Sequence, residues 1–238
     1  MLVQISGVDV YLGTKPTIRD IDLEIRRGQH WAILGPNGSG KTTLLRLIAG
    51  DVHPALGGRV RRFNFSSKNT LWEVRARLGY ISPDLQANYR EAIQGEAVVA
   101  SGFSSSIGII RKTTPAERRR VREVMKLFEI SSLALKNFLE MSYGEARRIL
   151  LARALVKNPA LILFDEPFDG LDAMARGLMT RAIGRAAESG ATIVVVTHHA
   201  DDLPDCITHV ARMEKGRLMD RRPIDAGLVL HHRGRWEI

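Results

Sequence analysis

A glycine-rich segment ending near residue 43 carries the residue types that bind a chain of phosphates. Residues 35–43 fit the spacing G-x-x-x-x-G-K-[ST]. In such a loop the backbone N–H groups point at an anion, the lysine reaches the β- and γ-phosphates, and the hydroxyl can bind Mg²⁺. The candidate nucleotide-binding residues are Gly35, Pro36, Asn37, Gly38, Ser39, Gly40, Lys41, Thr42 and Thr43.

Two neighbouring carboxylates follow the apolar run 161–164. Open α/β sheets bind ligands at the carboxyl ends of their strands, which is where Asp165 and Glu166 are expected to lie. Because adjacent strand residues point to opposite faces, the two carboxylates can have different roles. Asp165 is predicted to bind the metal together with Thr42, and Glu166 to orient a water toward the γ-phosphate.

The elements that position these residues follow an α/β pattern. A strand over 30–34 precedes the phosphate loop, and a helix begins after it. The continuous apolar runs 161–164 and 192–196 predict parallel strands that are buried on both faces. The alanine-rich stretch 172–188 between them predicts a helix, which gives a β-α-β crossover.

Alternating residues at the two ends of the chain predict antiparallel strands. Segments 8–11 and 18–25 alternate between apolar and polar residues and are joined around Gly13, and residues 210–218 have the pattern of a hairpin. We therefore expect a mainly parallel core sheet with an N-terminal antiparallel β subdomain.

The middle of the chain is predicted to be helical. Strand patterns are missing from 88–140, whereas residues 114–117 form a capping box with proline at the first helical position, followed by an apolar stripe. A second capping box, Ser142 to Glu145, opens a helix to Lys157, and a helix start with a serine hydroxyl can receive a phosphate. We interpret residues 88–157 as an inserted α-helical lobe.

Composition restricts the class of protein. The 238 residues are 45% hydrophobic and 26% charged, which suits one globular domain. No apolar run has membrane-spanning length, the first residues lack a secretory pattern, and Cys206 is the one cysteine, so an intracellular protein is expected. The formal net charge of +9 has two interpretations, a solvated helix face or a surface for nucleic acid or anionic lipid.

Five ordered motifs resemble those of ABC-type ATPases, which are P-loop NTPases. They are the phosphate loop, Met141–Glu145, Asp165–Pro167, Phe168–Asp172 and Val196–His198. The resemblance covers nearly all of residues 1–238 as one domain, and it implies that ATP and Mg²⁺ are bound. It also implies that Tyr11 stacks on adenine and that Lys41, Glu166 and His198 are catalytic. The signature segment that contacts the nucleotide of a second copy would be Ser142, Tyr143, Gly144 and Glu145.

The resemblance also implies partners and a location. Members of this family act as homodimers or heterodimers of nucleotide-binding domains. The favoured interpretation is the ATP-hydrolysing subunit of an ABC transporter, cytoplasmic and peripheral at the inner face of the membrane when bound to a separately encoded permease. The alternative is a soluble ABC ATPase that acts on nucleic acid or ribosomes.

The sequence departs from the family pattern at three positions. Tyr143 stands where glycine is usual, Glu145 where glutamine is usual, and Pro83 where the metal-linked glutamine is expected. Either Gln86 replaces that glutamine from a shifted loop, or a water takes its place. Neighbouring side chains on an extended segment diverge, so His198 and His199 are not expected to bind zinc together.

Further segments resemble the ModF-like subgroup, which is linked by name to molybdenum transport. They are residues 101–103, 106–108, 197–199 and 203–209.

Overall fold

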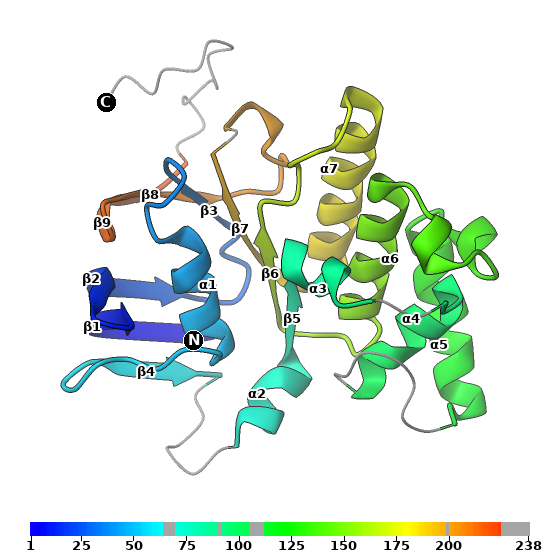
Figure 1. The fold of residues 1–238 in the computed structure, drawn as a ribbon, viewed down its shortest axis with the longest axis horizontal. Helices are drawn as coiled ribbons and strands as arrows, with labels where there is room; N and C mark the ends of the chain where they lie inside the picture. Colours follow the sequence, from blue (N-terminus) through cyan, green and yellow to red (C-terminus); the bar gives the residue numbers. More distant parts are fainter. Residues whose placement is uncertain (64–69, 90–91, 105–111, 199, 225–238) are drawn as a thin grey trace.

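The computed structural model describes residues 1–63, 70–89, 92–104, 112–198 and 200–224, without the side chains of Asp84 and Gln86 (Figure 1). Its centre is a six-stranded sheet in which the first five strands are parallel and the last is antiparallel to its neighbour. In spatial order the strands are β5 (Leu78–Ile81), β6 (Leu161–Asp165), β7 (Thr192–Thr197), β3 (Trp31–Leu34), β8 (His209–Glu214) and β9 (Arg217–Pro223).

A second, antiparallel sheet is built mostly from the N-terminal residues. Its order is β2 (Lys15–Ile25), β1 (Val3–Leu12) and β4 (Arg59–Arg62), with Val3 opposite Ile25 on one side and Arg62 on the other. Much of the polar and apolar alternation predicted for β1 and β2 appears as alternating burial, since Ile21, Leu23 and Ile25 are buried between exposed neighbours. The expected antiparallel subdomain is therefore present.

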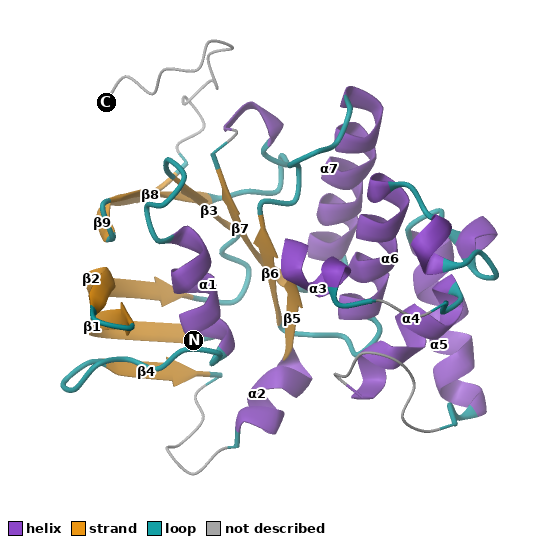
Figure 2. Ribbon diagram, viewed as in Figure 1, coloured by secondary structure: helices purple, strands orange, loops and turns teal. Residues whose placement is uncertain are grey.

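Helices cover both faces of the core sheet (Figure 2). Helix α1 (Lys41–Ala49) packs on one face, and α6 (Tyr143–Leu155) and α7 (Ala173–Glu188) pack on the other. Successive residues of β6 alternate between the two cores, because Leu161 and Leu163 join the α1 side while Ile162 and Phe164 join the α6 side. This two-sided burial explains the unbroken apolar runs of β6 and β7.

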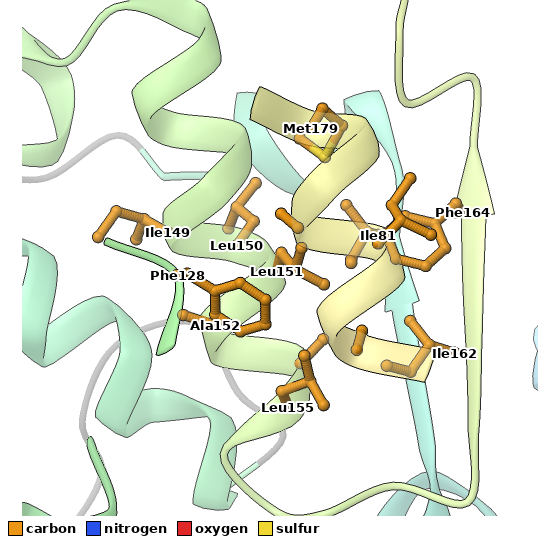
Figure 3. Close-up of a cluster of buried hydrophobic side chains, with 14 of the residues drawn as sticks. Ile81, Phe128, Ile149, Leu150, Leu151, Ala152, Leu155, Ile162, Phe164 and Met179 are labelled. Atoms are coloured by element: carbon orange, nitrogen blue, oxygen red, sulfur yellow. The ribbon is translucent and has the colours of Figure 1, made fainter. Parts of the chain in front are cut away.

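The α6 side of the core extends into the helical region (Figure 3). Here α4 (Gly95–Ser101) and α5 (Pro115–Leu127) pack against α6, and the predicted stripe of α5 is buried through Val121, Val124 and Met125. The capping box of α5 is confirmed, with Thr114 accepting from the Glu117 N–H group. Helix α6 ends at Leu155 and not at Lys157, two residues before the expected end.

Shorter elements complete the described chain. Helices α2 (Leu71–Arg77) and α3 (Pro83–Ala87) flank β5, and 3-10 turns lie at Gly102–Ser104, Ser131–Leu133, Phe138–Glu140 and Ala200–Asp202. None of the described helices combines the length and apolar character needed to cross a membrane. His199, residues 106–108 and residues 231–238 lie outside the described residues.

Candidate functional site

The phosphate loop lies at the carboxyl end of β3 and is held by close backbone contacts. Gly40 has φ +103°, and a Cβ there would lie 2.7 Å from Ile18 Cγ2. A Cβ on Gly35 would lie 2.2 Å from the carbonyl oxygen of Met213. Glycine is therefore needed at both positions, because the loop is packed against β2 and β8.

Lys41 is the first residue of α1, and its ammonium group lies inside the loop. Its Nζ donates to the carbonyl oxygens of Gly35 at 2.8 Å and Pro36 at 3.2 Å. Its Nζ also lies 3.1 Å from Oε1 of Glu166, and both side chains are largely buried. The loop therefore holds a cation next to the backbone that would wrap an anion.

The neighbouring Thr42 contacts Asp165, which ends β6. The Thr42 hydroxyl donates to Asp165 Oδ1 at 2.9 Å, and the Tyr80 hydroxyl donates to Oδ2 at 3.2 Å. Burial raises the pKa of Asp165, and both hydrogen bonds oppose that shift. Burial and the charge of Asp165 also raise the pKa of Tyr80. A hydroxyl and a carboxylate in contact are oxygen ligands of the kind Mg²⁺ prefers, so the residues present fit this metal.

Glu166 and His198 meet where β6 and β7 end side by side. Glu166 has φ +46°, so the chain bends away from the strand direction at this residue. Its Oε2 accepts from the backbone N–H of His198 at 3.2 Å and lies 3.1 Å from His198 Nδ1. Asp169 Oδ1 lies 3.9 Å from His198 Nε2. The carboxylate of Glu166 thus lies between Lys41 and His198.

A pocket of about 310 Å³ lies next to the phosphate loop. It is lined by Leu34, Gly35, Pro36, His198, Ala200 and Arg212. The strand order explains why these segments meet, since β3 lies between β7 and β8 and their carboxyl ends share one edge of the sheet.

Tyr11 lies in the β1–β2 hairpin, whose residues Thr17 and Ile18 pack against the loop. Tyr11 pairs with Pro16 across the hairpin. The residue after Pro16 is Thr17, whose carbonyl oxygen lies 3.1 Å from a Cβ built on Gly40. The Tyr11 side chain is exposed. An exposed ring on the hairpin that packs against the phosphate loop is available for stacking on a base.

The segment 142–145 starts α6 on the opposite face of the core sheet from α1. Ser142 caps the helix by accepting from the Glu145 N–H at 3.2 Å, and Glu145 Oε2 accepts from the Ser142 N–H at 2.7 Å. Glu145 also pairs with Lys136 at 2.7 Å, and this hydrogen bond lowers its pKa. The predicted capping box is confirmed, and the Ser142 side of the helix start is exposed.

Tyr143 connects this helix start to residues 169–172. Its ring lies 3.4 Å from a Cβ built on Gly170, and the guanidinium carbon of Arg147 lies 4.9 Å from the ring centroid. Arg147 also donates to the Tyr143 hydroxyl. Arg147 is fully buried, and its Nε and Nη1 have no hydrogen-bond partner among the described residues.

Three residues of this region were not predicted from the sequence. Tyr80 stands in a short strand between buried residues, Arg147 follows the buried Ala146 and precedes the partly exposed Arg148, and Arg212 lies on a hairpin strand far along the chain. No local pattern distinguishes them from core or surface residues. Gln86, proposed as a substitute at the Pro83 loop, has a side chain outside the described part of the structure.

Comparison with known proteins identifies the family. A family model described as "ABC transporter" matches residues 18–169. The chain belongs to the ABC transporter family. This ABC domain is an α/β P-loop ATPase domain, as the ordered motifs predicted.

Similar proteins agree with the assignment of the ABC domain. It is 37% identical over 213 residues to the ABC transporter ATP-binding protein ModF of Escherichia coli (strain K12), covering 86% of this chain and 42% of ModF. This agrees with the expected resemblance to the ModF-like subgroup. The chain thus spans less than half the length of this relative.

Solved structures have the same fold. The cbiO1 protein of Clostridium perfringens, part of the ABC transporter complex cbiONQ, superposes with a TM-score of 0.78 at 28% identity, covering 92% of this chain and 87% of cbiO1. A dimeric, post-hydrolysis structure of the ATP-binding cassette MJ0796 with ADP and Pi has a TM-score of 0.77 at 25% identity, covering 93% of this chain and 98% of MJ0796.

Proposed function

We propose that this chain binds MgATP and hydrolyses it as the nucleotide-binding subunit of an ABC transporter. The observation that carries the proposal is the convergence of Lys41, Glu166 and His198 at the carboxyl edge of the core sheet. A cation, a carboxylate and an imidazole placed beside a phosphate loop are suited to in-line attack of water on a γ-phosphoryl group.

The contacts support separate roles for these residues. Glu166, held between Lys41 and His198, orients the attacking water and accepts its proton. Lys41 and His198 stabilise the charge that develops on the γ-phosphoryl oxygens. Thr42 and Asp165 would hold Mg²⁺, which when bound neutralises charge on the phosphate oxygens.

The base and the rest of the triphosphate would be bound by the remaining loop residues and the exposed ring. The backbone of Gly35 to Thr43 wraps the phosphates, and Tyr11 stacks on adenine.

The placement of the signature segment supports a dimer. Because α1 and α6 cover opposite faces of the core sheet, Ser142 to Glu145 of one copy cannot close over the phosphate loop of the same copy. A second copy, identical or homologous, would present its Ser142 helix start to the γ-phosphate. The dimeric form of MJ0796 is a precedent for this arrangement.

The membrane partner is inferred from the relatives. ModF is named as an ABC transporter ATP-binding protein and cbiO1 as part of a transporter complex. We infer that this chain binds a separately encoded permease at the inner face of a membrane, and that the inserted helices over 88–157 contribute to that contact.

The test is the Glu166→Gln variant. Glutamine keeps the shape of the side chain but cannot accept the proton, so ATP is expected to remain bound and turnover to fall by about a hundredfold or more. Size-exclusion chromatography with MgATP should then show a dimer that the wild type does not accumulate. Glu123→Gln is the control, because Glu123 is exposed on α5 and its ion pair with Arg120 is long, at 3.7 Å.

A Glu166→Gln variant that stays monomeric with MgATP would contradict the proposal.

The alternative, action on nucleic acid or ribosomes, is favoured by the formal net charge of +9. Against it, several arginines are paired with carboxylates, among them Arg75 with Asp51 and Arg176 with Asp202, both at 2.8 Å. Recovery with an integral membrane protein supports transport, whereas salt-sensitive recovery with RNA supports the alternative.

A further inference from the structure

Tyr80 connects β5 to the end of β6. Tyr80 is the third residue of β5 and lies opposite Leu163 in the parallel pairing of the two strands. From there its hydroxyl reaches Asp165, two residues further along β6, and donates to Oδ2 at 3.2 Å. The contact therefore runs from the strand that precedes Pro83 to the predicted metal ligand.

The Asp165 carboxylate has one hydroxyl donor on each oxygen. Asp165 is 3% exposed, Thr42 donates to Oδ1 at 2.9 Å, and Tyr80 donates to Oδ2. A buried carboxylate that loses one of its donors is left with an unsatisfied oxygen and can rotate to find another partner. The Tyr80 hydroxyl thus fixes the orientation in which Asp165 presents its oxygens beside Thr42.

Tyr80 also lines a cavity next to β5, the edge strand of the core sheet that leads to Pro83. The cavity has a volume of about 450 Å³, and Arg46, Ser82 and Leu85 are among its lining residues. Pro83 begins α3 and carries no polar side-chain atom. Among the described side chains of this part of the chain, the polar contact to Asp165 comes from the strand residue Tyr80.

We propose that Tyr80 is a positioning residue that holds the Asp165 carboxylate in the rotamer needed for Mg²⁺. The inference rests on the proposed function, because it is under that proposal that Asp165 binds the metal. It goes beyond that function by assigning a strand tyrosine, three residues before Pro83, the orientation of the Asp165 carboxylate. Hydrogen-bonding partners behind a metal ligand commonly change metal affinity ten- to a hundredfold when they are removed.

The experiment compares full-length wild type with Tyr80→Phe. Phenylalanine keeps the ring in its packing and removes only the hydroxyl. Mn²⁺ binding in the presence of ATP is measured by electron paramagnetic resonance, and binding of a fluorescent ATP analogue is measured in EDTA. Thermal unfolding checks the fold.

The control is Tyr89→Phe. Tyr89 is also buried, and its hydroxyl lies 3.1 Å from Ser101 Oγ in the helical region, so the variant loses one buried hydroxyl contact away from Asp165. A general effect of losing a tyrosine hydroxyl would appear in both variants.

The expected result is an Mn²⁺ dissociation constant raised by about tenfold in Tyr80→Phe, with metal-free nucleotide binding unchanged within twofold. Tyr89→Phe should leave both constants unchanged. An unchanged Mn²⁺ constant in Tyr80→Phe, with normal binding in the wild type, would overturn the role of Tyr80 alone. A wild type that binds no Mn²⁺ with ATP would instead overturn the proposed function.

Discussion

At the scale of single residues, the site depends on backbone conformations that side chains alone do not explain. Glu166 has φ +46°, an uncommon value for a residue with a Cβ. The bend turns its carboxylate toward Lys41 and His198, while Asp165 remains buried beside Thr42. Asp165 and Glu166 therefore point in different directions, as predicted. The bend at Glu166 contributes to this in addition to the alternation of side chains along the strand.

Gly40 allows a direct test of the phosphate loop. We expect Gly40→Ala to destabilise the fold by about 2 kcal/mol and to weaken nucleotide binding strongly, because φ is +103° and the new Cβ would lie 2.7 Å from Ile18 Cγ2. Urea unfolding and titration with a fluorescent ATP analogue measure the two effects.

The matched control for this variant is Gly13→Ala. Gly13 also has a positive φ, +67°, but a Cβ there meets no atom within 4 Å. It should cost about 1 kcal/mol of stability and leave nucleotide affinity unchanged. Equal losses of affinity in the two variants would argue against the close packing of the loop.

Much of the site could be predicted from the sequence because its spacing is local. Lys41 and Thr42 follow from covalent neighbours in one motif, and Asp165 and Glu166 follow from the end of an apolar run. Tyr80 could not be found in this way, because a tyrosine in a short strand has the pattern of a core residue. Its role depends on the pairing of β5 with β6, which joins residues 85 positions apart.

At the scale of elements, the success of prediction followed the strength of the local pattern. Helix α5 has a capping box and a clear apolar stripe, and it was predicted with its first residue. Helix α2 also has a capping box, formed by Thr70 and Glu73, and this signal could have revealed it. Strand β4 is rich in arginine and lies at a sheet edge, so its sequence has no strand pattern.

Helix α6 is buried nearly all round, so its most unusual residue could not be recognised from the sequence. Its apolar positions do not form one stripe, and Arg147 lies among them with no exposure. The guanidinium has the Tyr143 ring and hydroxyl as contacts, while its Nε and Nη1 find no hydrogen-bond partner in the described chain. Removing such a charge from water is unfavourable in free energy, and the contact with the Tyr143 ring offsets only part of this desolvation penalty.

We therefore expect Arg147→Met to be at least as stable as the wild type, with a gain of about 1 kcal/mol. Methionine fills a similar length and needs no hydrogen bonds. Urea unfolding checks this, with Arg148→Met, on the same turn but partly exposed, as the comparison. A loss above about 2 kcal/mol in Arg147→Met would show that the buried charge is compensated by contacts other than Tyr143.

At the scale of the whole molecule, the core sheet joins segments from both ends of the chain. Strand β3 near the N-terminus lies between β7 and β8, and residue 30 just before it contacts both neighbours. The carbonyl oxygen of His30 accepts from the N–H groups of Thr208 and His209, both at 2.9 Å. The Ile193 N–H donates to His30 Nδ1 at 3.1 Å. His30 is thus a junction between three strands.

This junction predicts sensitivity to acid. Burial and the nearby His209 lower the pKa of His30, and burial lowers the pKa of His209. Because both folded-state values lie below 6.5, the unfolded chain binds more protons than the folded chain as the pH falls through this value. Stability is therefore lost on acidification, and a proton on His30 Nδ1 would also remove the acceptor of the Ile193 N–H.

The test of this junction is His30→Asn, which keeps a side-chain acceptor but does not titrate. We expect the urea midpoint of the wild type to fall between pH 7.5 and pH 5.5, and the fall to be smaller in the variant. His53→Asn, at an exposed histidine, should follow the wild type. If His30→Asn lost as much stability as the wild type over this range, the acid sensitivity would arise elsewhere, and the contacts of β3 with β7 and β8 would not depend on the protonation of His30.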